Sequence, residues 1–303
     1  MKLELEIVTI CPICQGKTFK PVLKCTDELV SKEQFSIIKC STCGLHLTSP
    51  RPPLNSIGRY YKSAEYVSHS DSKRGVINWA YHYVRSIALK QKLGYVRQHS
   101  KGKRLLDNGS GSGGFLSYMT NNGFDCVGLE PDPDARSLAL SKYNIELQEP
   151  SVLGEMLGHK KFDVITMWHV LEHIHEPVAL LKKLHTLLEN SGVLFIAVPN
   201  HRSKDAQVYK NNWAAYDVPR HLFHFSKDTI SKAASRSGFL VDQIVPMRFD
   251  SYYVSMLSEK NQGGNIVSGG FNGLKSNLIA RFRNDEYSSH IYVLRPLRQN
   301  KAT

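Results

Sequence analysis

The stretch Leu-Leu-Asp-Asn-Gly-Ser-Gly-Ser-Gly-Gly, residues 105–114, decides the fold of this 303-residue chain. Its apolar start is typical of a β-strand, and the loop that follows contains four glycines. The next residues, Phe115, Leu116 and Met119, are spaced as on the buried face of a helix. Glycines at a strand-to-helix turn permit a tight bend and let a ligand approach the backbone closely. The stretch therefore predicts a βα unit with a ligand at its loop.

Beyond this unit, strand-like and helix-like runs alternate, which is typical of an α/β sheet protein. A helix with leucines on one face is predicted between two apolar strands, and another is predicted at 225–237 with Ser226 as its N-cap. Residues 75–99, with Trp79, Tyr83 and Val84 at helical spacing, predict a connecting helix, and the Gly-, Ser- and Asn-rich residues 258–277 predict a mobile loop. The predicted strands are 104–106, 124–129, 144–147, 162–167, 193–198, 239–245 and 290–294.

Two carboxylates flank the glycine loop. Glu130 ends the second predicted strand, where it can accept hydrogen bonds from both ribose hydroxyls of a nucleoside cofactor. Gly109, Gly111 and Gly114 match the fingerprint G-x-G-x-x-G, so a nicotinamide or flavin cofactor is one possibility. Asp107, just before the loop, would repel a pyrophosphate but attract the α-ammonium group of a sulfonium cofactor. The position of this acid favours the sulfonium cofactor.

Residues 103–250 resemble the class I S-adenosylmethionine-dependent methyltransferases. The segments that carry the resemblance are, in order, LLDNGSGSG at 105–113, VGLEPD at 127–132, FDVI at 162–165, VLEH at 170–173 and GVLFIAVPN at 192–200. The resemblance implies an α/β, Rossmann-like seven-stranded sheet with helices on both faces and S-adenosyl-L-methionine over the carboxyl ends of its strands. The cofactor-binding residues that it implies are Asp107, Gly109, Gly111, Gly113, Glu130, Pro131, Trp168 and His169.

Four cysteines near the start of the chain form two C-x-x-C pairs, Cys11 with Cys14 and Cys40 with Cys43. Two such pairs place four thiolates for tetrahedral Zn²⁺, and a closed four-sulfur site is structural. The long spacing between the pairs predicts a zinc-ribbon-like module with a hairpin between them. This layout also resembles the N-terminal module of some small-molecule and sugar methyltransferases. We predict a zinc-binding module at 1–60, a connecting helical segment at 61–100 and a methyltransferase domain at 101–303.

The segment 213–225, after the fifth strand, concentrates aromatic, basic and acidic side chains where the open end of the sheet would hold an acceptor. We hypothesise that His221 or His224 is the general base that deprotonates an acceptor hydroxyl. Arg220 or Asp217 would then orient the acceptor. A purely structural lid is the alternative for this segment.

Residues 169–173 read H-x-x-E-H, the pattern of one class of zinc protease. The protease interpretation requires both histidines on one helix, whereas this segment directly follows a strand and is interrupted by Pro177. In a methyltransferase the same segment would line the mouth of the cofactor site, where Glu172 and His173 could face the pocket. A structural role for either histidine is the alternative.

The formal net charge of +12 leaves nucleic acid as a possible partner, although no run of like charges appears. We therefore predict transfer of a methyl group to a small-molecule or glycan acceptor by O- or C-methylation, with RNA methylation as the alternative. A noncatalytic zinc adaptor would require a degraded cofactor site. No apolar run approaches the length of a membrane helix, so no membrane partner is expected and a cytoplasmic location is predicted. The sequence leaves the oligomeric state open.

Overall fold

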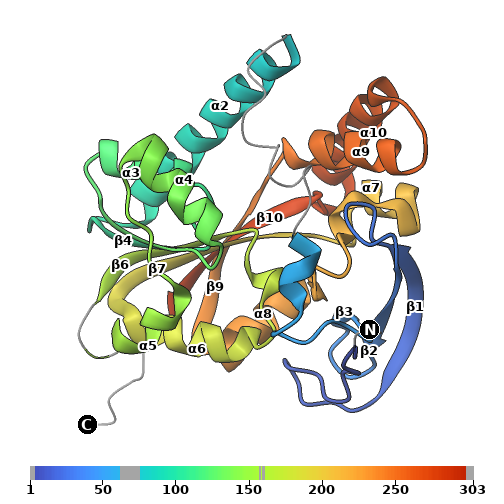
Figure 1. Ribbon diagram of the computed structural model, residues 1–303, viewed down its shortest axis with the longest axis horizontal. Helices are drawn as coiled ribbons and strands as arrows, with labels where there is room; N and C mark the ends of the chain where they lie inside the picture. The colour runs from blue at the N-terminus through green and yellow to red at the C-terminus, as the bar shows by residue number, and fades with distance from the viewer. Residues whose placement is uncertain (1–3, 62–75, 157, 159–160, 298–303) are drawn as a thin grey trace.

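The structure, a computed structural model, describes residues 4–61, 76–156, 158 and 161–297, without the side chains of 76–84 and 284. Its main sheet has six strands in the order β5-β4-β6-β7-β10-β9 (Figure 1). Strands β5, β4, β6 and β7 are parallel, and β10 is antiparallel to β7 and β9. The fold class is the predicted one. The strand bounds are β4 Arg104–Asn108, β5 Asp125–Leu129, β6 Phe162–Trp168, β7 Leu188–Pro199, β9 Phe239–Pro246 and β10 Ser289–Pro296.

Helices cover both faces of this sheet, with α2, α3 and α4 on one face and α5, α6 and α8 on the other (Figure 1). Their bounds are α2 Val76–His99, α3 Gly114–Asn121, α4 Pro133–Tyr143, α5 Leu153–Met156, α6 Pro177–Leu187 and α8 Lys227–Arg236. The remaining α-helices are α7 Lys204–Tyr209, α9 Asp250–Asn261 and α10 Ile266–Ile279. The short 3₁₀ helices are η1 Ile57–Tyr61, η2 Pro150–Val152, η3 Leu171–His173, η4 Lys210–Asn212 and η5 Ala214–Tyr216, and η6 Ala280–Asn284 is a π-helix.

The core divides along the sheet because neighbouring strand residues point to opposite faces. Leu106 and Ile165 belong to the buried cluster that contacts α6 and α8, whereas Leu105 and Val164 belong to the cluster that contacts α2 and α3. The connecting helix and the helix capped by Ser226 are confirmed as α2 and α8; the side chains of Trp79, Tyr83 and Val84 lie outside the description.

The predicted strand at 144–147 is wrong, so the described sheet has six strands and not the seven that the resemblance implied. Asn144 caps α4 in the left-handed conformation, and Pro150 opens the next helical turn. Only Gln148 pairs with the sheet: its N–H donates to the carbonyl of Gly128 at 2.9 Å, and its carbonyl accepts from the Glu130 N–H at 2.9 Å. The N–H groups of Asn144 and Ile145 instead donate back to carbonyls of α4, so the start of this segment stays with the helix.

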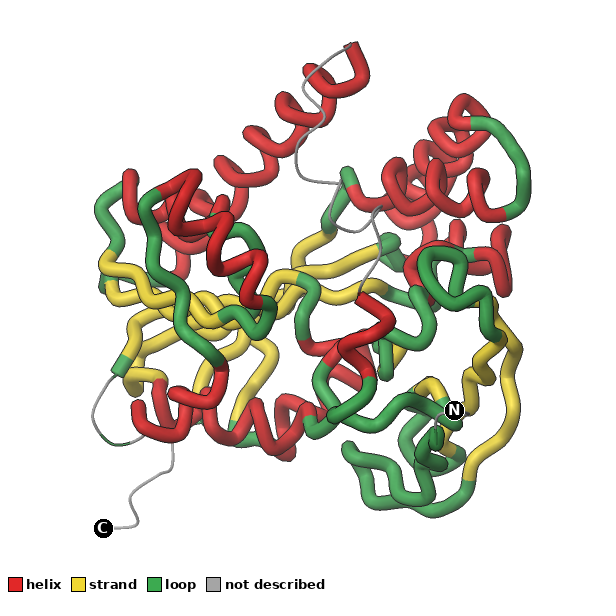
Figure 2. Tube along the Cα trace, viewed as in Figure 1, coloured by secondary structure: helices red, strands yellow, loops and turns green. Residues whose placement is uncertain are grey.

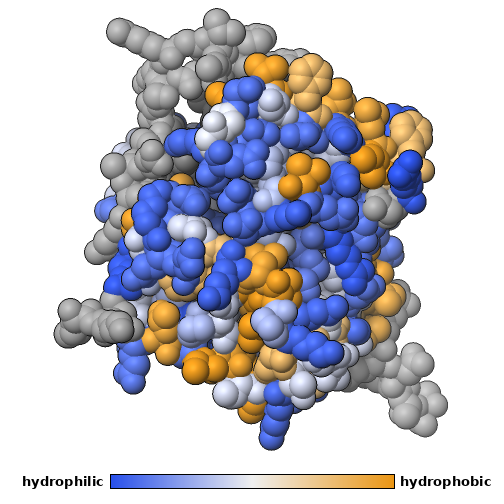
Figure 3. All heavy atoms as spheres, turned by 90° about the vertical axis from the view of Figure 1, so that its right-hand side faces the viewer, coloured by the Kyte–Doolittle hydropathy of each residue, from blue (hydrophilic) through white to orange (hydrophobic). Residues whose placement is uncertain are grey.

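The predicted loop at 258–277 is also wrong, because most of it lies in the paired helices α9 and α10. Two of its glycines face α9 closely: a Cβ on Gly269 would lie 2.6 Å from the Met256 Cα, and one on Gly273 would lie 2.7 Å from the Tyr252 Cα. Glycine here permits close helix packing and does not break the helix. The outer side of α10 carries exposed apolar residues, and apolar atoms gather at the top of the view in Figure 3.

The N-terminal part consists mostly of strand and loop (Figure 2). A hairpin of β1 and β2 connects the two cysteine pairs, as predicted, and β3 follows it. The short strand β8 pairs with β3, so a segment that follows β7 of the main sheet completes this second sheet. The strand bounds are β1 Phe19–Thr26, β2 Gln34–Cys40, β3 His46–Thr48 and β8 Phe223–His224.

Among the helices of the described residues, none combines the length and apolar character that crossing a lipid bilayer requires.

Candidate cofactor and acceptor site

The glycine loop connects β4 to α3 in the conformation that its sequence predicts. Gly109, Gly111 and Gly113 all have positive φ angles, of 84°, 52° and 77°. A Cβ on Gly109 would lie 2.4 Å from a methyl group of Val170, so that glycine is required by packing as well as by backbone conformation. A Cβ on Gly111 would meet nothing within 4 Å. The loop is thus tightly held on one side and open at Gly111, where a ligand can approach the backbone.

Glu130 follows β5 directly and faces this loop. One carboxylate oxygen accepts from the Gly111 N–H at 2.7 Å, and the other accepts from the Asp132 N–H at 3.0 Å. Burial raises the pKa of Glu130, although these two N–H donors oppose the shift. The carboxylate and Pro131 therefore lie beside the open part of the loop, where the sequence places the ribose of a cofactor.

Asp107, the acid before the loop, is almost fully buried and accepts a hydrogen bond from the Thr166 hydroxyl at 2.6 Å. Burial raises the pKa of Asp107 to about 6, against the opposing effect of Thr166 and of the Lys92 ammonium group. Burial lowers the pKa of Lys92 to about 8. At neutral pH Asp107 is therefore still mostly ionised, which is what attraction of a cationic ligand group requires.

Trp168 ends β6 and His169 follows it directly, but the two side chains differ in their surroundings. The ring of Trp168 packs against Phe115 and lies 4.2 Å from the Lys92 ammonium nitrogen. His169 has a positive φ of 58°, and its two ring nitrogens lie 3.4 Å from Glu172 and 3.2 Å from Asp250. Of the two side chains, His169 is the one held between charged groups.

The electrostatics of His169 follow from that position. Burial on its own would lower the pKa of His169, but the carboxylates of Asp250 and Glu172 raise it to about 10. The imidazole is thus a cation at neutral pH. Its left-handed backbone and the three-residue turn η3 also show that residues 169–173 do not form one helix, so the geometry of the H-x-x-E-H protease is absent from this segment.

Arg220 joins the N-terminal part to the segment 213–225. Its guanidinium group, 1% exposed, donates to Asp27 at 2.9 Å, to Asp217 at 2.6 Å and to the carbonyl of Tyr60 at 2.8 Å. Asp27 is itself fully buried and also accepts from the N–H of Ser31. Through these contacts Arg220 ties the segment 213–225 to Asp27 and Tyr60 of the N-terminal part.

The two predicted base candidates occupy different environments. His224 lies in β8, with its Nε2 3.2 Å from the Thr48 hydroxyl, and burial lowers its pKa well below the usual value. His221 is held by a contact of 2.9 Å between its Nδ1 and the carbonyl oxygen of Ala215. One nitrogen of His221 shares a cluster with Glu172 and His173, within 4.8 Å of both. The structure thus brings His221, and not His224, to the segment after β6.

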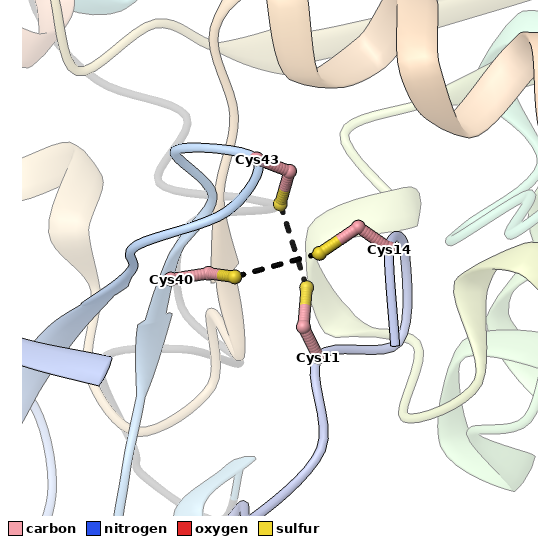
Figure 4. A group of neighbouring side chains, drawn as sticks. All are labelled: Cys11, Cys14, Cys40 and Cys43. Atoms are coloured by element: carbon pink, nitrogen blue, oxygen red, sulfur yellow. Dashed lines mark hydrogen bonds between the residues drawn. The ribbon is translucent and has the colours of Figure 1, made fainter. Parts of the chain in front are cut away.

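The four predicted metal ligands converge (Figure 4). The Sγ atoms of Cys11 and Cys43 are 3.5 Å apart, as are those of Cys14 and Cys40. Tetrahedral zinc with Zn–S bonds of about 2.3 Å separates its sulfur ligands by about 3.8 Å. Burial raises the pKa of Cys43 to about 11, so a cation is needed to hold that sulfur as a thiolate. The donor set and its spacing fit zinc.

Sequence reasoning did not assign Lys92 or Asp250 to the site. Lys92 comes from α2 and Asp250 from the start of α9, and both lie near residues at the carboxyl ends of β4 and β6. Neither residue belongs to a motif. Lys92 lies in the polar run Lys90-Gln91-Lys92, so no local pattern singled it out, and none singled out Asp250.

A family model described as "Methyltransferase domain" matches residues 79–244. The chain is 32% identical to the ubiquinone biosynthesis O-methyltransferase of Glaesserella parasuis over 126 residues, which cover 37% of this chain and 53% of the relative. It is 33% identical to the protein of the same name from Aeromonas salmonicida over 110 residues, which cover 34% of this chain and 46% of the relative. The chain thus spans about half the length of the curated relatives it matches.

Among solved structures, the chain is similar to the magnesium protoporphyrin IX methyltransferase of Synechocystis PCC 6803 with bound SAH. The TM-score is 0.53 at 14% sequence identity, and the match covers 80% of this chain and 99% of the other. At this identity the similarity concerns the fold, which is shared over most of the chain.

Proposed function

The chain belongs to the S-adenosylmethionine-dependent methyltransferase family, and from this premise we propose that it methylates a hydroxyl oxygen of a small organic acceptor. Family membership decides between the two cofactors that the glycine loop left open, in favour of S-adenosylmethionine. The relatives named above are O-methyltransferases of ubiquinone biosynthesis, which supports a small-molecule acceptor. The comparisons give no support to RNA methylation. A cytoplasmic location stays a prediction.

The observation that carries the proposal is the intact cofactor edge, with an open glycine loop and two carboxylates beside it. Asp107 would attract the α-ammonium group of the cofactor, and Glu130 would accept hydrogen bonds from the ribose hydroxyls. Bound there, the cofactor supplies an electrophilic methyl group on its sulfonium. The remaining task of the protein is to orient an acceptor oxygen in line with that methyl group and to remove its proton.

On the acceptor side, the contacts favour His221 among the four predicted catalytic residues. Its Nδ1 faces a backbone carbonyl, which leaves Nε2 as the nitrogen that can accept a proton. In this proposal Arg220, Asp217 and His224 act by positioning: the first two hold the loop that carries His221, and His224 anchors β8. We also propose that the four cysteines hold a structural Zn²⁺ and that 1–60, 61–100 and 101–303 are the functional divisions of the chain.

Calorimetry with S-adenosylmethionine tests the cofactor assignment, and a radiolabelled-methyl screen against small hydroxylated compounds tests the acceptor class. Glu130→Gln keeps the shape of the side chain but replaces one acceptor oxygen with an amide. We expect it to weaken cofactor binding about 10- to 100-fold, since a hydrogen bond to a charged group contributes about 1.5–3 kcal/mol.

Glu149→Gln is the matched control, because Glu149 is exposed and pairs with Arg136 at the surface. It should bind the cofactor as the unmodified protein does. Equal affinity of the Glu130 and Glu149 variants would remove Glu130 from the cofactor site, and tight binding of a dinucleotide instead would overturn the proposal as a whole.

A further inference from the structure

Glu172, in the turn η3 just after β6, is a fully buried carboxylate whose oxygens both lack a hydrogen-bond partner among the described residues. Its nearest cationic neighbour is His169, whose Nδ1 lies 3.4 Å from one oxygen without hydrogen-bond geometry. An unsatisfied buried acceptor costs free energy, and the cost is larger when the group is charged. His169 balances part of the Glu172 charge, but among the described residues no donor fills the hydrogen-bonding capacity of the two oxygens.

Two histidines adjoin this carboxylate, and each has one nitrogen facing a backbone carbonyl. The Nδ1 of His173 lies 3.1 Å from the carbonyl oxygen of Arg220, and the Nδ1 of His221 lies 2.9 Å from that of Ala215. A carbonyl oxygen only accepts hydrogen bonds, so each Nδ1 carries the proton and each Nε2 keeps its lone pair. The Tyr61 hydroxyl also lies 3.0 Å from the His173 Nδ1.

These three side chains converge. The rings of His173 and His221 have centroids 4.6 Å apart and are nearly perpendicular. One nitrogen from each ring and one Glu172 oxygen all lie within 4.8 Å of one another. The Asp217 carboxylate, 3.9 Å from the His221 Nε2, adds a further negative charge. Arg220 already balances the Asp217 charge, and His169 balances part of the Glu172 charge. A cation among the two histidine lone pairs and the Glu172 oxygens would nevertheless be attracted by all three groups.

We propose that Glu172, His173 and His221 bind a divalent transition-metal ion, separate from the four-cysteine site. Two imidazoles and one carboxylate are a ligand set that selects such metals over Mg²⁺ or Ca²⁺. Bonds of about 2.1 Å place neighbouring ligands roughly 3–3.5 Å apart, so the side chains would close on the ion by about 1 Å. Second contacts from the Nδ1 atoms to carbonyl oxygens are the usual support of metal-bound histidines.

Three protein ligands leave coordination positions for an oxygen of the acceptor. The location of this metal at the acceptor end rests on the proposed function, although its binding does not. Coordination to a metal would favour the deprotonated form of the acceptor hydroxyl, and the released proton would pass to solvent water. In the metal-loaded protein His221 is thus a ligand, and its role as a base applies to the metal-free protein.

The test titrates Co²⁺ into the zinc-loaded full-length protein and follows the visible d–d absorption, equilibrium dialysis and the melting temperature. We expect one Co²⁺ per chain beyond the zinc, and a rise in melting temperature with Co²⁺ concentration. Glu172→Gln, nearly isosteric, should weaken this binding at least 10-fold and abolish the rise. Glu176→Gln changes an exposed carboxylate four residues away and should leave both unchanged.

Absence of bound Co²⁺ beyond the zinc at millimolar concentration, or equal binding by the Glu172 and Glu176 variants, would overturn the proposal and leave water as the partner of the cluster. If the Glu172 variant does not fold, His221→Gln serves in its place with the same expectation. Calorimetry with S-adenosylmethionine on the same samples separates the two proposals: Co²⁺ binding without cofactor binding would contradict the proposed function alone.

Discussion

Replacing Cys43 with serine is expected to remove the bound zinc and to lower the melting temperature by about 8 °C. Structural zinc sites contribute roughly 10 kcal/mol or more of apparent binding free energy in isolated fingers, and half of that corresponds to such a shift in a chain of this size. The loss of stability affects the main sheet as well as the N-terminal part, because Cys11, Cys40 and Cys43 belong to the same buried cluster as residues of the main sheet. Metal analysis and thermal denaturation measure both effects.

Cys126→Ser is the matched control, since Cys126 lies in β5, outside the four-cysteine cluster, and is partly exposed. It should retain one zinc per chain and a nearly unchanged melting temperature. A metal-chelating agent should reproduce the effect of Cys43→Ser in the unmodified protein. Unmodified protein that contains no zinc yet melts at the same temperature with and without added Zn²⁺ would contradict the assignment.

Replacing Arg220 with methionine is expected to destabilise the protein by about 3–5 kcal/mol, which lowers the melting temperature by on the order of 10 °C. The substitution preserves much of the side-chain volume but leaves Asp27 buried and without its cation. It also removes the contacts of the Arg220 guanidinium group with Asp217 and with the Tyr60 carbonyl oxygen. Thermal and denaturant unfolding measure the loss.

Arg236→Met, at an exposed position on α8, controls for the loss of one positive charge and should change stability by less than about 0.5 kcal/mol. The triple variant with Asp27→Asn and Asp217→Asn should recover part of the stability, because the unpaired charges are then gone. Loss of a structural clamp lowers stability, whereas loss of an acceptor-binding residue raises the KM for the acceptor. An Arg220 variant of normal stability with a raised KM for the acceptor would show that Arg220 orients the substrate.

The sequence by itself determined the α/β class, the cofactor loop and the four-cysteine cluster. These features depend on local patterns: glycines that must adopt positive φ at 109–113, carboxylates at the ends of adjacent parallel strands, and paired C-x-x-C spacing. Local conformation and the alternation of strand and helix carry such information directly. The same local reasoning failed at 258–277, where glycine composition suggested a loop but Gly269 and Gly273 permit two helices to pack.

Only the tertiary structure decided which of the acceptor-side residues lie together. The motif at 169–173 and the segment 213–225 are separated in the chain by α6, β7, α7 and η4. His221 reaches Glu172 because Arg220 and β8 tie its loop to the N-terminal sheet. His224, three residues away, is turned into that sheet instead. Long-range contacts of this kind depend on the packing of distant segments, which no local pattern encodes.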